Sequence, residues 1–214
     1  MGTKKSLINI CLFYFIIILH FSFGSDDFEL RNAITFQLKL PHSFKIECKQ
    51  GLWLSGQELS FKQTFTEFDL SYKINNRFNI FIPFRYGIFK DEIKKRISFG
   101  GSYKYNFKTL SFRYKTRFQR VYEQDNKLEE TFRNKFSVIN KVKKDFELFL
   151  SAELFNPQDQ NSDNKINEYR ISFGANTGFS KNKSIKTFYT FKAEDINKES
   201  PDITNIIGLS YNFN

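Results

Sequence analysis

The sequence is poor in the residues that build disulfides, metal clusters and catalytic bases. It has two cysteines and two histidines in 214 residues. Cys11 and His20 fall in an N-terminal segment that we predict to be removed, which leaves Cys48 and His42. A single cysteine cannot form an intramolecular disulfide or a cysteine-based metal cluster. His42 adjoins Pro41 at a predicted turn, where we expect a solvated turn residue rather than a catalytic base.

Long apolar runs are also scarce, and the one that exists lies near the N-terminus. Lys4 and Lys5 precede the apolar run Leu7–Leu19, small residues follow up to Gly24, and the sequence then turns acidic at "SDDFE". This order is typical of a secretory signal peptide cleaved near Gly24. An uncleaved membrane anchor is the alternative, but the run is short for a membrane helix of roughly 20 residues. We therefore predict a signal peptide at 1–24 and a single domain at 25–214 with no membrane-spanning helix.

Aromatic residues are abundant in a chain that is otherwise polar. There are 28 Phe and 10 Tyr, yet the mean hydropathy is −0.47 and the net charge is +10. Such a composition fits apolar residues that alternate with polar ones. In "KTLSFRYKTRFQR", at 108–120, the even positions include Leu110, Phe112, Tyr114 and Phe118, and the odd positions include Arg113, Lys115, Arg117 and Gln119. Since successive side chains of a strand point to opposite faces, one face is aromatic and the other cationic.

The same alternation recurs along the chain and predicts about eleven strand segments. They are 28–40, 44–54, 68–74, 77–88, 97–107, 108–120, 132–138, 146–154, 169–179, 185–193 and 203–213. Short connections such as "NN", "KVKK" and "SKNK" alternate with longer polar ones such as "NPQDQNSDNK" and "EDINKESPD". Transmembrane barrels of the outer-membrane type have tight turns at one end and loops at the other. We predict an all-β, up-and-down antiparallel transmembrane β-barrel of ten to twelve strands.

The first segment does not fit this scheme easily. If the C-terminus and every short turn lie on the periplasmic side, residues 28–40 run from the outer side of the membrane toward the periplasm. Single-chain bacterial barrels usually have an even number of strands. Either 52–63 contains a further strand, or 28–40 is not part of the barrel wall.

The aromatic residues indicate which face meets lipid. Six of them lie on the apolar face beside a short turn or the C-terminus: Tyr72, Phe78, Phe107, Phe146, Phe179 and Phe213. Aromatic girdles of this kind mark a lipid-facing surface. We therefore expect the apolar face to contact lipid, with Phe112 near mid-membrane and Thr116 nearer an end. The alternatives are a soluble sheet with a wetted charged face, or a secreted or periplasmic soluble barrel that binds an apolar ligand inside.

Inward-facing charges form the one candidate site that the sequence offers. We predict a lumen charge cluster in which Glu153 and Arg170, on neighbouring strands, form a pair or a near-diagonal contact; its members are Arg85, Arg113, Arg117, Arg133, Glu147, Glu153 and Arg170. Both signs occur, so ion pairs can fill a small lumen, and the excess of Arg and Lys favours anions if the barrel conducts.

No catalytic, cofactor or metal site is predicted. Glu147 and Glu153 are near 20 Å apart along a strand, too far for paired acid–base work at ~3.4 Å per residue. The glycines of "SFGG" and "FGANTG" do not open a helix and are therefore not phosphate loops. Strand glycines of this kind more often mark close packing or kinks.

The order of several short motifs resembles a known family. These motifs are "TFTEFDLSYKIN", "FRYG", "LSFRYKTRFQ", "TFRNKFSV", "FLSAELF", "NEYRISFGANTGFSKNKSIKTFYTFK" and "IIGLSYNFN". Over about residues 26–214 the chain is similar to domain of unknown function 2490, a group of Gram-negative outer-membrane proteins. The resemblance implies a β-barrel in the outer membrane, and it implies no reaction and no ligand.

We therefore expect an exported, integral outer-membrane barrel that acts as a narrow channel, a transporter or a structural element and not as an enzyme. Its expected partners are outer-membrane lipid and lipopolysaccharide, with the barrel-assembly machinery during insertion. Nucleic acid is not expected, because the basic residues alternate with aromatic ones across two faces and the protein is exported. The sequence leaves the solute and the oligomeric state open.

Overall fold

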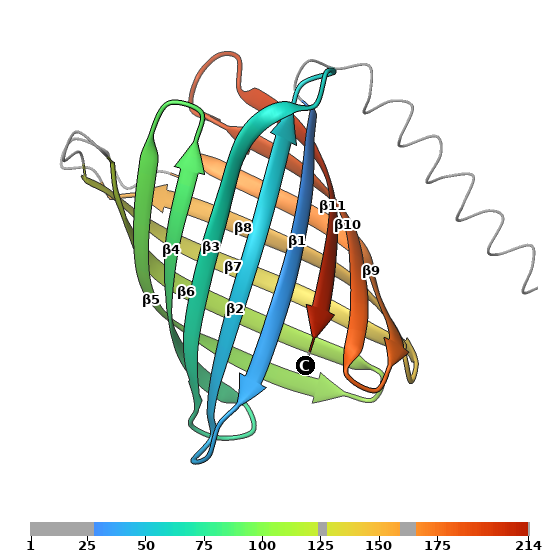
Figure 1. The fold of residues 1–214 in the computed structure, drawn as a ribbon. Coiled ribbons are helices and arrows are strands. Elements are labelled where there is room, and N and C mark those ends of the chain that lie inside the picture. Colours follow the sequence, from blue (N-terminus) through green and yellow to red (C-terminus); the bar gives the residue numbers. More distant parts are fainter. Residues whose placement is uncertain (1–27, 124–127, 159–165, 214) are drawn as a thin grey trace, which may run out of the picture.

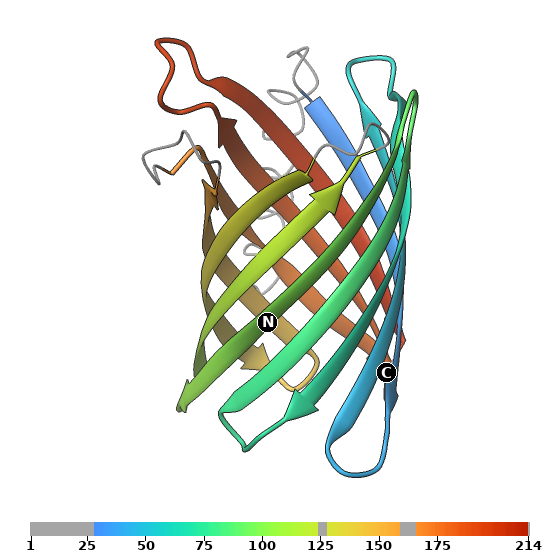
Figure 2. The same cartoon turned by 90° about the vertical axis from the view of Figure 1, so that its left-hand side faces the viewer.

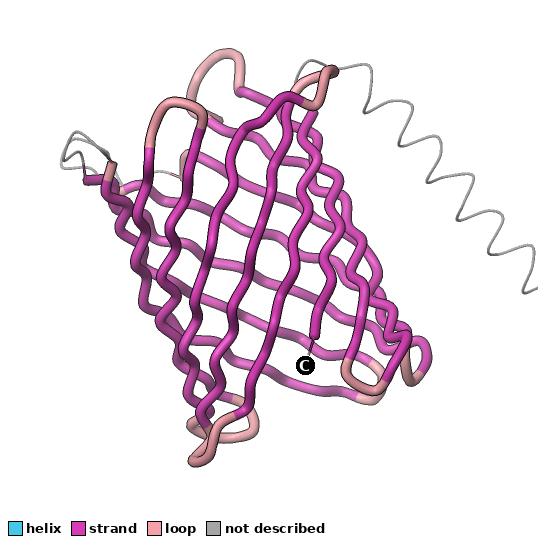
Figure 3. Tube along the Cα trace, viewed as in Figure 1, coloured by secondary structure: helices cyan, strands magenta, loops and turns pink. Residues whose placement is uncertain are grey.

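The computed structural model describes residues 28–123, 128–158 and 166–213, so the predicted signal peptide lies outside the described residues. The regular structure in these ranges is all strand (Figure 3). The strands are β1 (Phe28–Lys39), β2 (Phe44–Ser55), β3 (Ser60–Lys73), β4 (Phe78–Phe89), β5 (Ile93–Phe107), β6 (Leu110–Tyr122), β7 (Leu128–Lys143), β8 (Phe146–Pro157), β9 (Glu168–Ser180), β10 (Lys183–Glu194) and β11 (Asp202–Phe213). Within the same ranges, no helix has the length and apolar character needed to cross a membrane.

These strands close into one barrel (Figures 1 and 2). Each strand pairs antiparallel with the next one, and β1 pairs parallel with β11, from Phe28 opposite Asn205 to Phe36 opposite Phe213. An odd number of strands in an up-and-down meander requires one parallel seam, because the first and last strands then run the same way. The predicted range of ten to twelve strands contains the observed count, and the fold class is confirmed.

Both explanations offered for the first segment are wrong. β1 is a full wall strand, hydrogen-bonded on both sides, and no strand is hidden between β2 and β3. The chain therefore enters the barrel at the end opposite its C-terminus. Figure 1 shows β1 beside β11, with the C-terminus at the lower end.

The two ends of the barrel differ in their connections. Residues 40–43, 74–77, 108–109, 144–145 and 181–182 form the turns at the end that holds the C-terminus, and 56–59, 90–92, 123–127, 158–167 and 195–201 connect strands at the other end. The predicted short–long alternation holds in the second half of the chain. It fails at 90–92, which is shorter than the opposite turn 74–77, because β4 and β5 extend into the residues predicted as a polar loop.

The outer surface of the barrel is apolar. In β8, Leu148, Leu150 and Leu154 are exposed, whereas Ser151 and Glu153 are buried on the lumen side. An apolar exterior around a charged interior is the arrangement of a transmembrane barrel. A soluble barrel with an apolar ligand inside needs the reverse arrangement, so that alternative is excluded.

Aromatic rings gather on the outer surface at the C-terminal end, as the girdle predicts. They form neighbouring pairs across strands: Phe36 with Phe213 at 4.9 Å between ring centroids, Phe44 with Tyr72 at 4.8 Å, and Phe78 with Tyr103 at 4.8 Å. Such cross-strand ring pairs stabilise a sheet by a fraction of a kcal/mol to about 1 kcal/mol each.

The expected depths of two outward residues on β6 are wrong. Because β6 spans Leu110–Tyr122, Thr116 lies at its middle and Phe112 lies near the turn at 108–109. Of the two, Thr116 is therefore the residue at the middle of the barrel wall, and we expect it to lie deeper in the membrane than Phe112.

Several aromatic rings point inward and lie over glycines of the wall. A Cβ atom on Gly51 would lie 2.3 Å from the Phe65 ring, and one on Gly208 would lie 1.9 Å from the Phe188 ring. Gly100 and Gly174, in the two motifs predicted to mark close packing, are likewise crowded by neighbouring aromatic rings and backbone atoms. The close packing is confirmed, and it lets rings lie flat against the wall and fill part of the lumen.

Candidate functional site

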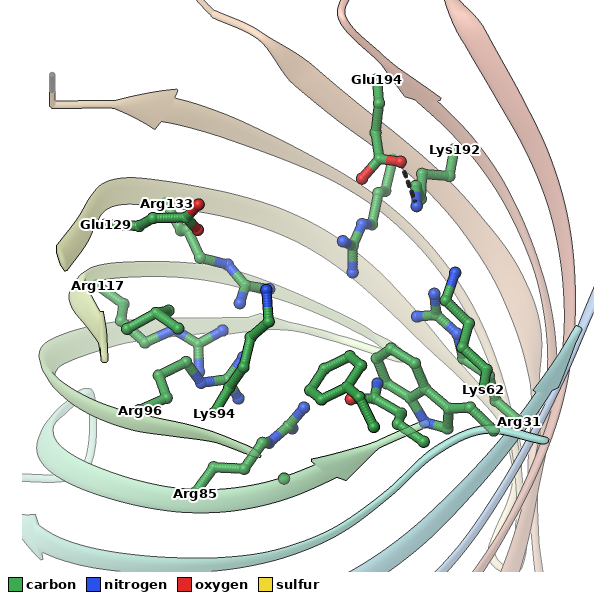
Figure 4. Close-up of a pocket in the computed structure, with 16 residues that line it drawn as sticks. Arg31, Lys62, Arg85, Lys94, Arg96, Arg117, Glu129, Arg133, Lys192 and Glu194 are labelled. Carbon is green, nitrogen blue, oxygen red and sulfur yellow. Dashed lines mark ion pairs between the residues drawn. The ribbon is translucent and has the colours of Figure 1, made fainter. Parts of the chain in front are cut away.

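A cavity of about 450 Å³ opens inside the barrel, toward the end that carries the longer loops. We call it the basic vestibule. It is lined by nine cationic side chains and two carboxylates, together with Trp53, Gln63, Gly87, Phe89 and Val121; the charged residues are Arg31, Lys62, Arg85, Lys94, Arg96, Arg117, Arg133, Arg170, Lys192, Glu129 and Glu194. Figure 4 shows guanidinium and ammonium groups from many strands turned toward one space.

One wall of the vestibule is built from neighbouring positions on β3, β4 and β5. Arg85 lies opposite Glu67 on one side and opposite Arg96 on the other. Both arginines contact the same oxygen of Glu67, Oε2, at 2.7 Å each. One carboxylate therefore holds two guanidinium groups.

Next to this wall, β6, β7 and β8 repeat the arrangement around Glu153. Arg133 donates to Glu153 Oε1 from Nη2 at 2.7 Å and from Nε at 3.2 Å. Lys135 lies 3.8 Å from this carboxylate and Arg117 lies 4.0 Å from it. Glu153 is therefore shared by three cations.

The opposite side of the vestibule comes from β1, β3 and β10. Arg31 on β1 contacts Glu29 at 2.6 Å, and Lys62 on β3 contacts the same carboxylate at 2.5 Å. The Arg31 guanidinium lies 3.7 Å above the Trp53 ring. On β10, Lys192 pairs with Glu194 at 2.6 Å, the interaction drawn as a dashed line in Figure 4.

Aromatic rings fix the orientation of the guanidinium groups. Arg133 and Arg170 lie 4.2 and 4.4 Å from the centroid of Phe155, and Arg85 lies 3.8 Å from that of Phe65. A stacked guanidinium keeps its N–H donors in the plane of the group, directed sideways, where an oxyanion can accept from two of them.

The ion pairs leave an excess of positive charge. Three carboxylates, Glu29, Glu67 and Glu153, are shared by seven cations: Arg31 and Lys62, Arg85 and Arg96, and Arg117, Arg133 and Lys135. The other three cations of the lining have carboxylates of their own: Lys94 pairs with Glu92 and Glu123, Arg170 with Glu168, and Lys192 with Glu194. The side chains around the vestibule therefore include more cations than carboxylates. A cleft with low-dielectric walls and charges of one sign raises the local concentration of counter-ions.

The structure brings part of the predicted lumen cluster together. Arg85, Arg117, Arg133 and Arg170 line the vestibule, and Glu153 lies beside it, bound to Arg133. Arg113 and Glu147 do not line it, because they lie closer to the opposite, short-turn end of β6 and β8.

The predicted contact between Glu153 and Arg170 is correct in register and wrong as an ion pair. The two residues are directly opposite on β8 and β9. Arg170 turns instead to Glu168, and Glu153 binds Arg133 on its other side. The strands are tilted, so a side chain reaches a residue two positions along a neighbouring strand as readily as the one opposite.

Sequence reasoning missed Arg31, Lys62 and Arg96 as members of the site. Arg31 and Arg96 have the inward parity of their segments, which was the available signal. Lys62 lies at a register shift between β2 and β3, where the alternation of the pattern is interrupted.

No metal-binding arrangement is present in the described part of the chain, where no group of three or more His, Cys, Asp or Glu is suitably placed. His42 lies in the turn 40–43 with φ of 57°, a conformation typical of a turn.

Comparison with known proteins identifies the family of this chain. The sequence profile of the family described as "Protein of unknown function (DUF2490)" matches residues 28–200. The chain belongs to the DUF2490 family. No curated protein matches its sequence.

Solved structures similar to this DUF2490 protein are outer-membrane barrels. A NanC porin structure has a TM-score of 0.55 at 10% identity, covering 87% of this chain and 98% of that one. A KdgM porin has a TM-score of 0.50 at 13% identity, covering 76% and 88%. A bacterial polysaccharide outer membrane secretin has a TM-score of 0.53 at 9% identity; 83% of this chain is covered, and it spans 64% of that protein, less than two thirds of its length. At these identities the likeness shows the fold, an outer-membrane β-barrel.

Proposed function

We propose that this DUF2490 protein is a narrow outer-membrane channel that favours small anions. The observation that carries the proposal is the charge of the vestibule, which is lined by nine cationic side chains and two carboxylates. The likeness in fold to two porins supports a conducting role and says nothing of the solute.

The arrangement of the lumen suggests how an anion would pass. The vestibule, at the end with longer loops, would concentrate anions by its field. Guanidinium donors would replace part of the hydration shell of the anion, and the stacked rings hold these donors in place. Farther from the vestibule, Lys115 and Lys186 would offer the next positive charges, each above a phenylalanine ring.

Shared ion pairs also make the channel narrow. Glu67 and Glu153 hold arginines of neighbouring strands against the inner wall, and inward rings such as Phe65 and Phe81 are buried. A structural barrel closed by these groups is the second candidate, and the same ion pairs favour it. Conductance separates the two, since a closed barrel carries no current.

The test is the ion selectivity of purified full-length protein in planar bilayers under a salt gradient. Arg96→Gln removes one vestibule charge and leaves Glu67 paired with Arg85, so the barrel should still fold. We expect it to conduct with weaker preference for anions. The matched control is Lys198→Gln, which removes a charge from the loop 195–201 with its side chain 66% exposed, and should leave selectivity unchanged. A wild type without current, or equal effects of both variants, would contradict the proposal.

A further inference from the structure

Lys186 on β10 is an inward-facing cation for which the described residues supply no counter-charge. No carboxylate among them lies within ion-pair distance of its ammonium and none accepts a hydrogen bond from it, whereas Arg133, Arg85 and Arg31 each have a carboxylate. The charged groups that act on it most strongly are Lys135, Lys49 and Arg113, all of them cations. This part of the lumen therefore lacks a negative charge.

Among the residues that lie side by side with Lys186 on neighbouring strands, the nearest carboxylate is that of Glu147. Glu147 lies two strands away, with Asn176 between it and Lys186. On its other side Glu147 is opposite Lys141 of β7. Lys186 is consequently left to attract an anion from solution.

Asn176 on β9 is directly opposite Lys186, and it has a buried oxygen without a donor. Its Oδ1 atom accepts no hydrogen bond from any described residue. Side chains that are opposite each other across antiparallel strands have Cβ atoms about 4.5–5.5 Å apart. A buried acceptor without a partner is unfavourable, and a ligand hydroxyl would satisfy it.

The surroundings consist of small side chains and an apolar surface. On the other side of Lys186 the residues side by side on neighbouring strands are Ser210 and then Ala33, both small. The Lys186 ammonium lies 4.3 Å from the centroid of Phe149 and 5.7 Å from that of Phe188. These rings can pack against the carbon skeleton of a ligand, while the ammonium and the amide contact its polar groups.

We propose that Lys186 and Asn176 form a binding site for a small carboxylate that carries hydroxyl groups. The carboxylate accepts from Lys186, and a hydroxyl donates to Asn176 Oδ1. The site lies below the vestibule in the same lumen; it deepens the proposed function by naming a substrate class, and it rests on an anion being able to enter.

The test uses three probes of similar chain length and titration calorimetry on the full chain folded in detergent. Gluconate has the charge and the hydroxyls, hexanoate has the charge alone, and sorbitol has the hydroxyls alone. We expect gluconate to bind more tightly than either of the others. This ranking is measured on the wild type and does not depend on whether any variant folds.

Two variants assign the site. Lys186→Gln should weaken gluconate binding about tenfold or more, since a hydrogen bond to a charged group is lost. Asn176→Ala should weaken gluconate binding and leave hexanoate binding unchanged. The control is Lys104→Gln, a lumen lysine next to the turn at 74–77, and it should bind gluconate as the wild type does.

The inference and the proposed function can fail separately. If the wild type conducts anions but binds gluconate no better than hexanoate, or if Lys186→Gln leaves gluconate binding intact, the site is overturned and the channel stands. If gluconate binding is lost in Lys186→Gln while the wild type carries no current, the site stands and the channel is overturned.

Discussion

Glu153→Gln is the substitution that tests the lumen most sharply. The Glu153 side chain is 11% exposed and that of Arg133 is 10% exposed, so the pair is largely removed from water. The glutamine keeps the shape of the side chain and loses its charge. Arg133, Lys135 and Arg117 then face one another without the carboxylate that they share.

The expected loss of stability follows from these distances. At 3.8 and 4.0 Å, Lys135 and Arg117 would each be attracted to Glu153 by about 4 kcal/mol at an effective dielectric constant near 20. Desolvation and the repulsion among the cations offset most of that attraction. Removing one partner of a buried pair costs about 3–5 kcal/mol, and we expect Glu153→Gln to fall in this range. If water reached this ion pair itself, the cost would drop below about 1 kcal/mol.

The assay is urea unfolding of the barrel from lipid vesicles, followed by the fluorescence of Trp53, the single tryptophan of the chain. The control is Glu47→Gln, whose side chain is 26% exposed and pairs with the half-buried Lys45 at 3.4 Å; it should cost less than about 1 kcal/mol. The double variant Glu153→Gln with Arg133→Gln removes one charge of each sign and should recover part of the loss. Equal small losses of unfolding free energy for Glu153→Gln and Glu47→Gln would refute the claim that the ion pairs of Glu153 are buried.

Three further predictions concern the wall of the barrel. Thr116→Arg, at the middle of the barrel wall, should lower the unfolding free energy by about 2–4 kcal/mol and Phe112→Arg by less, and equal losses in the same urea assay would contradict the lipid-facing assignment. Gly208→Ala should be strongly destabilising alone and much less so in a Phe188→Ala background, because the three atoms nearest to the added Cβ all belong to that ring; additive effects in this double-mutant cycle would contradict the packing. An epitope inserted just before Phe28 should be accessible on intact cells if the C-terminal end of the barrel is periplasmic, and labelling only after outer-membrane disruption would contradict the parallel seam.

Alternation along the chain was enough to predict the barrel, because the two faces of a strand can be read from neighbouring residues. It could not predict the closure. The pairing of β1 with β11 joins residues such as Phe28 and Asn205 from opposite ends of the chain, and nothing local in either segment encodes a parallel partner. For the same reason the direction of β1 looked inconsistent with a barrel.

Parity also identified the inward charges, but not their partners. Arg96 and Glu67 are inward by their positions, yet their contact spans two neighbouring strand pairs and depends on the register of both. Glu153 reaches Arg133 rather than Arg170 because tilt and side-chain length decide among several nearby cations. The inward rings were missed since Phe65 is an apolar residue on a polar face, and its partner Gly51 gives no separate signal in sequence.

The most direct test of the anion channel is the zero-current potential of the wild-type protein in a planar bilayer between two potassium chloride solutions of unequal concentration. An excess of lumen cations predicts a sign that corresponds to chloride passing more readily than potassium. A potential of the opposite sign, or a purified and correctly folded barrel that carries no current, would contradict the account.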